Sequence, residues 1–113
     1  MPAGVVDASA LIFLAKLQRL DALKVFSPVL STREALDEVV AGLATGHRDA
    51  LAVQAAVDGR RIAIRPAPPL ATALAHLGRG ERSVLALARR LAGSTAILDD
   101  LGAIRAAHNL GVR

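Results

Sequence analysis

The sequence predicts an α/β fold with three layers, in which helices cover both faces of a short central parallel β-sheet. Three observations predict it: short apolar runs alternate with longer segments of helical spacing, Gly, Pro and Asp punctuate these runs, and no segment is repeated. Strands that alternate with helices imply right-handed crossovers between parallel neighbours. The 113 residues suffice for one modest core, so residues 1–113 are predicted to form a single domain.

Four short segments are expected to form the strands. One of them, Arg61–Arg65, alternates in polarity and is bounded by Gly59 and Pro66, which is typical of a strand between two turns. The four segments are Val5–Val6, Val29–Leu30, Arg61–Arg65 and TAIL at 95–98.

Seven segments are expected to be helical. In the clearest of them, Val84, Leu87, Ala88 and Leu91 share one face. Ser31 or Thr32 is expected to cap the third helix. The segments are Ala10–Leu17, RLDALKVF at 19–26, REALDEVVAGL at 33–43 with Gly42 near its end, HRDALAVQAAVDG at 47–59, Ala71–His76, GRGERSVLALARRLAG at 78–93, and LGAIRAAHNLG with a C-cap at Gly111.

The composition predicts a soluble protein of the cytoplasm. The chain has no cysteine, which excludes a disulfide framework and thiolate zinc sites, and no apolar run approaches the roughly 18 residues of a membrane span. Its start lacks the basic and apolar segments of a secretion signal. The formal charge of +4 comes mainly from arginines. This excess favours a nucleic-acid partner, although codon usage in a GC-rich genome produces the same excess.

Three aspartates follow the first and last predicted strands. Because functional groups collect at the carboxyl ends of parallel strands, Asp7, Asp99 and Asp100 are predicted to lie at one edge of the sheet. Asp7 is one candidate for the helix cap, and Ser9 is the alternative candidate that would leave Asp7 facing the edge. Asp100 alone would cap the last helix. The adjacent Asp99 then repels it with no structural gain, so the pair favours a metal ion.

Two glutamates have weaker individual support. Glu81 opens the clearest helix, where a carboxylate complements the helix dipole, and the run Gly78-Arg79-Gly80 before it allows a close approach of the backbone. Glu38 lies four residues after Glu34, and this spacing alone favours a solvated helix face.

Other kinds of site have less support. His47, His76 and His108 have no spacing typical of a zinc site, and none can be paired with Ser9 as a nucleophile. A receiver-like phospho-acceptor domain also gathers aspartates at strand ends. It needs a lysine late in the chain, whereas both lysines lie within the first 24 residues.

Four blocks span nearly the whole chain: VVDASALIFLAKL, STREALDEVV, LGRGERSVLALA and AILDDLGAIRAA. Together they resemble the PIN-domain nucleases, and within that superfamily the VapC-like proteins of prokaryotes. Those proteins carry D-x-S-x-L-I-x-L-A-K, a G-E helix, and an aspartate pair followed by Ala and Arg. Each piece is short and unspecific, but four blocks in the same order make a specific match.

The resemblance implies a Mg²⁺- or Mn²⁺-dependent endoribonuclease, typically the toxin of a toxin–antitoxin pair, with a cognate antitoxin protein as partner. Crowded carboxylates repel one another, and a hard divalent ion bound by oxygen ligands relieves that repulsion. Transferred by position, the catalytic and metal-binding acids are Asp7, Glu38, Glu81, and Asp99, Asp100 or both.

The resemblance also implies supporting residues. Ser9 would support Asp7, and Arg105 matches the basic residue that follows the aspartate pair. Arg79 and Arg82 are expected to hold the phosphates of RNA.

The sequence departs from the family pattern at its end. The family continues with another strand and more helix, whereas this sequence stops at Arg113. The last strand is therefore expected to be absent or only begun, with the exposed face covered by a partner or by a second copy in a homodimer. The departure also motivates an alternative function: a catalytically silent, truncated PIN-like module that binds a protein partner or RNA.

Overall fold

The computed structural model describes residues 2–44, 49–69, 77–99, 104, 105 and 107, and it contains a four-stranded parallel sheet. Val5 of the central strand pairs with Leu30 on one side and with Ala96 on the other. The strand order is β3-β2-β1-β4, and the predicted α/β fold with a parallel sheet is confirmed. The strands are β1 (Gly4–Val6), β2 (Val29–Thr32), β3 (Ala63–Arg65) and β4 (Thr95–Ile97).

The helices follow the predicted order, with differences at their ends. The segment after α1 is a 3₁₀-helix, η1, and α2 continues past Gly42 instead of ending there. β3 begins at Ala63 and not at the predicted Arg61. The amides of Arg61 and Ile62 both donate to Ala56 O, so these two residues close the end of α3. The predicted helix Ala71–His76 and most of the segment 101–111 lie outside the described residues. The helices are α1 (Ala8–Lys16), η1 (Leu20–Val25), α2 (Arg33–Ala44), α3 (Asp49–Asp58) and α4 (Arg79–Arg90).

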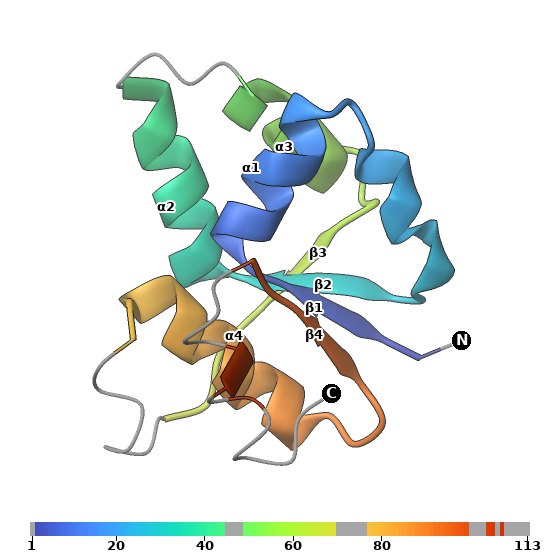
Figure 1. The fold of residues 1–113 in the computed structure, drawn as a ribbon, viewed down its shortest axis with the longest axis vertical. Coiled ribbons are helices and arrows are strands. Elements are labelled where there is room, and N and C mark those ends of the chain that lie inside the picture. The colour runs from blue at the N-terminus through green and yellow to red at the C-terminus, as the bar shows by residue number, and fades with distance from the viewer. Residues whose placement is uncertain (1, 45–48, 70–76, 100–103, 106, 108–113) are drawn as a thin grey trace.

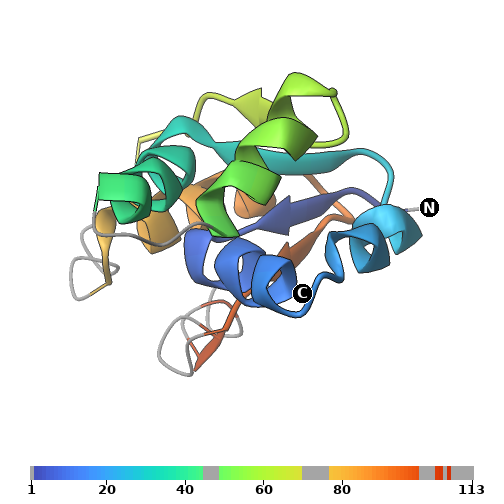
Figure 2. The same ribbon diagram turned by 90° about the horizontal axis from the view of Figure 1, so that it is seen from above.

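The helices form a layer on each face of the sheet. α1 and α3 pack against one another on one face, and α4 covers the other face (Figures 1 and 2). α2 stands beyond the ends of the strands and contacts α1, α3 and α4. The start of α4 therefore lies near the end of the sheet from which α1 and α2 also begin (Figure 1).

The core is aliphatic, as the composition predicted. Val5, Val84 and Leu85 are completely buried, whereas the side chain of Phe13 is 52% exposed. Two consecutive buried residues show that α4 is covered on more than its sheet-facing side, because α2 packs against it. Within the described parts of the chain, no helix is long and apolar enough to cross a bilayer.

Candidate active site

Asp7 and Asp99 leave two neighbouring strands at the same edge of the sheet, here called the carboxyl edge. Val6 pairs with Ile97 at the ends of β1 and β4, and the Asp7 amide donates to Ile97 O at 3.1 Å. Asp99 follows two residues after Ile97 and is exposed. The pairing thus places at one edge of the sheet two residues that are 92 positions apart in the sequence. Asp100 lies outside the described residues.

Asp7 is buried, with 1% exposure, and its carboxylate accepts hydrogen bonds from the two residues that follow it. Its Oδ1 accepts from Ala8 N at 2.7 Å, and its Oδ2 accepts from Ser9 Oγ at 3.3 Å. Asp7 is therefore the N-cap of α1, so of the two candidate caps the structure uses Asp7 and not Ser9. The helix begins at Ala8, two residues earlier than predicted, because the extended backbone of Asp7 places its side chain against the first turn. Ser9 instead fixes the orientation of the carboxylate.

Glu38 lies in α2, but its carboxylate contacts the start of α4. Its Oε1 accepts a hydrogen bond from Gly80 N at 2.9 Å. A negative charge is favourable at this place, because the first amides of a helix have no partner within the helix. The carboxylate is thus bound in the first turn of α4, and a purely solvated helix face does not describe Glu38.

Glycine at position 80 makes this contact possible. A Cβ added there would lie 2.6 Å from Glu38 Oε1 and 2.9 Å from Oε2. Gly78 has a similar relation to Glu81, whose Oε1 would lie 3.2 Å from an added Cβ. The predicted close approach at Gly78-Arg79-Gly80 is therefore observed, and both glutamate carboxylates lie against the first turn of α4.

Two buried hydroxyl groups join β2 to the same turn of α4. Ser83 Oγ donates to Gly80 O at 2.6 Å, so its one proton is already used. Thr32 Oγ1, 2.6 Å from Ser83 Oγ, must then be the donor in that pair, while it accepts from Ala35 N at 3.1 Å. Thr32 is consequently the cap of α2, which the sequence predicted as one of two alternatives.

β2 also holds the end of β1. Ser31 Oγ donates at 2.7 Å to the carbonyl oxygen of Val6, the residue immediately before Asp7. Ser31 and its neighbour Thr32 thereby connect the strand that positions Asp7 to the helix whose start binds Glu38. Sequence reasoning predicted no role for Ser83 and only a capping role for Ser31. The one signal for Ser83 is a serine on an otherwise apolar, buried helix face.

The predicted basic residues differ in exposure. Arg79 and Arg105 are exposed, whereas Arg82 is half-buried. The Nε of Arg82 is buried and has no hydrogen-bond partner among the described residues. Arg79 is therefore the more accessible of the two arginines at the start of α4.

The donor chemistry of these acids fits a hard divalent ion, since carboxylate and hydroxyl oxygens are the ligands that Mg²⁺ and Mn²⁺ prefer. Within the parts of the chain that the structure describes, no three His, Cys, Asp or Glu side chains lie close enough to hold a metal ion. Asp7 and Asp99 thus lie at the ends of β1 and β4, Glu38 and Glu81 lie at the start of α4, and the hydroxyl groups of β2 connect these two places.

A parallel sheet covered by helices, with acidic residues at its carboxyl edge and at the adjoining helix start, is typical of α/β proteins whose functional groups collect at the ends of the strands. Residues 3–113 match the family model described as PIN domain, and the chain belongs to this family. PIN domains are in general metal-dependent nucleases, and they act on nucleic acids. No curated protein matches the chain in a sequence comparison.

Proposed function

We propose that the protein is an endoribonuclease that hydrolyses RNA phosphodiester bonds with Mg²⁺ or Mn²⁺ bound by carboxylates. The observation that carries the proposal is the hydrogen bond from the Asp7 amide to Ile97 O, which leaves Asp7 and the segment containing Asp99 at one edge of a PIN-domain sheet. The Arg-rich charge of +4 supports a polyanionic substrate.

In this proposal the ion is held by the predicted acids. The ion would polarise the scissile phosphate and lower the pKa of the attacking water. Ser9 keeps the Asp7 carboxylate in one orientation, and the Gly80 amide does the same for Glu38. Arg79, exposed at the start of α4, would bind a neighbouring phosphate, with Arg82 beside it and Arg105 at the aspartate pair. The proposed ligands are Asp7, Glu38, Glu81, Asp99 and Asp100.

An RNA-cleavage assay with Mg²⁺ or Mn²⁺ tests the reaction, with Asp7→Asn as the decisive variant. An Asn side chain retains an oxygen that can accept from Ala8 N, so α1 keeps its cap while the charge is lost. We expect cleavage to fall by at least about 100-fold, as for loss of a catalytic group. Equal cleavage by the parent protein and by Asp7→Asn would contradict the proposal.

A second function is a silent module that binds RNA or a protein without cutting. It is favoured by one observation: the described residues contain no group of three metal-ligating side chains. Calorimetry with Mn²⁺ separates the two functions. Binding that is lost in both Asp7→Asn and Asp99→Asn supports the enzyme, and the absence of binding by the parent protein supports the silent module.

The biological role that we propose is that of the toxin of a VapBC-type toxin–antitoxin pair, acting in the cytoplasm. A cognate antitoxin would then suppress RNA cleavage when it is produced together with this protein. Growth of cells that express the protein alone, the protein with its neighbouring gene product, or Asp7→Asn alone tests this role. Sedimentation of the purified protein tests whether it forms a homodimer.

A further inference from the structure

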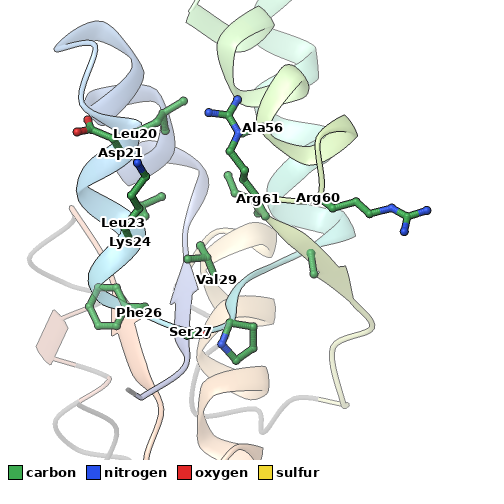
Figure 3. A pocket seen from close by; sticks show the side chains of 13 residues that line it. Leu20, Asp21, Leu23, Lys24, Phe26, Ser27, Val29, Ala56, Arg60 and Arg61 are labelled. Carbon is green, nitrogen blue, oxygen red and sulfur yellow. The ribbon is translucent and has the colours of Figure 1, made fainter.

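A pocket of about 440 Å³ opens at the amino ends of β2 and β3, opposite the carboxyl edge. One wall is η1, the other is the turn from α3 into β3, and Val29 lies between them (Figure 3). We call it the amino-edge pocket. Its volume lies within the range of roughly 300–1,000 Å³ that is usual for small-molecule sites.

The interior of the amino-edge pocket is mainly apolar. Leu20 and Leu23 project from η1 toward the opposite wall, which includes the buried side chains of Ala56 and Ile62 (Figure 3). Binding of an apolar body to such a surface is favourable, because it removes apolar surface from water. The pocket therefore fits a ligand with an apolar body.

The rim of the pocket is basic. Lys24 lies along the η1 wall and Arg61 along the opposite wall, with its guanidinium directed back toward Leu20 (Figure 3). The acid of the rim, Asp21, is 3.7 Å from Arg19 in the one ion pair found among the described residues. Lys24 and Arg61 thus face the pocket from two sides without a protein counter-ion in the described part of the chain.

We propose that the amino-edge pocket binds a small organic anion, in which an apolar body contacts the leucine-lined interior and a carboxylate or phosphate lies between Lys24 and Arg61. Arg60 also lines the pocket, but its side chain points away from it (Figure 3). Arg60 is therefore a matched control, since it has the same charge and a neighbouring position but a different direction. This proposal is independent of RNA cleavage.

Fluorescence titration with anilinonaphthalene sulfonate tests the proposal, because this probe joins an apolar body to one anionic group. We expect saturable binding by the parent protein, a loss of affinity of about two- to fivefold in Lys24→Gln and in Arg61→Gln, and about tenfold in the double variant. Arg60→Gln should bind within twofold of the parent protein. Phenylnaphthylamine, which has the same rings and no charge, should bind all variants equally.

Two further arms identify the source of the anion. Displacement of the probe by decanoate indicates an aliphatic carboxylate, and displacement by uridine monophosphate indicates a nucleotide. Thermal unfolding of each variant verifies that the probe reports on folded protein. Equal probe affinity in Arg61→Gln and Arg60→Gln, or displacement by neither anion, would overturn the proposal.

Discussion

The Glu38 carboxylate accepts a hydrogen bond from the backbone amide of Gly80 at 2.9 Å, across 42 positions of sequence. This bond joins α2 to α4 and gives the first turn of α4 a capping group that its N-cap, Gly78, cannot supply, because glycine has no side chain. Glu38 is thus both a proposed metal ligand and the residue that satisfies a helix start. The two roles can be separated by substitution.

Gly80→Ala is expected to displace Glu38 while the fold is kept. The added Cβ would lie 2.6 Å from Oε1, but the carboxylate is the flexible end of an exposed side chain and can move away. The gain in helix propensity, about 0.5–1 kcal/mol, offsets most of the lost hydrogen bond. The free energy of unfolding, measured with urea, should therefore change by no more than about 1 kcal/mol. RNA cleavage should fall as far as it does in Glu38→Ala.

The double variant provides the control for this expectation. If Gly80→Ala acts through Glu38, adding it to Glu38→Ala should cause no further loss of cleavage. If the losses of cleavage in the two single variants multiplied in the double variant, Gly80 would affect cleavage independently of Glu38. Glu38→Gln keeps an acceptor for the Gly80 amide, so its stability should remain close to that of the parent protein while cleavage is lost.

The Thr32–Ser83 pair is expected to be strongly coupled. Ser83→Ala leaves the buried Thr32 hydroxyl without its acceptor, which costs about 1–3 kcal/mol, and Thr32→Val removes the cap of Ala35 N as well. In the double variant, the loss in the free energy of unfolding should be smaller than the sum of the two single losses by at least about 1 kcal/mol. The reason is that the second substitution removes a group that is already unpaired. Urea unfolding of the three variants measures this coupling, and simple additivity would contradict it.

Asp7→Ala and Asp7→Asn should differ in stability but not in metal response. Ala removes the acceptor for Ala8 N and should lower the free energy of unfolding by about 1–2 kcal/mol, whereas Asn should cost only a few tenths. Mn²⁺ should raise the Tm of the parent protein by mass action and leave both variants unshifted. A Tm increase of the same size in Asp7→Asn would remove Asp7 from the proposed ligands.

The architecture could be predicted because its signals are local. The run Val5–Val6, the alternation at Arg61–Arg65 and the helical spacing after Gly80 each reflect the burial of one short segment. The position of Asp7 beside the end of β4 also followed, since parallel strands end at a common edge.

The details of the site could not be predicted because they depend on pairs that are distant in sequence. Asp7 and Ser9 are equally good caps by residue type, so only the backbone conformation at Asp7 decides between them. Glu38 and Ser83 are ordinary helix residues in sequence. Their roles arise because α2 packs across the start of α4, and no periodicity reports that packing.

The ends of α1 and α3 provide a prediction about stability alone. Gln18 and Arg60 both have a positive φ, at 55° and 61°, and each follows the last turn of a helix. The amides of the next residues, Arg19 and Arg61, donate back to carbonyl oxygens five positions earlier, a pattern that favours glycine in the left-handed residue.

Gln18→Gly and Arg60→Gly should therefore each raise the free energy of unfolding by about 0.5–1 kcal/mol, as relief of the left-handed strain exceeds the entropy that glycine adds to the unfolded chain. Urea unfolding measures the change. Ala55→Gly, at an exposed position inside α3, is the matched control and should lower stability by about 1 kcal/mol. If Arg60→Gly destabilised the protein as much as Ala55→Gly does, the left-handed conformation at residue 60 would not carry the strain that its φ implies.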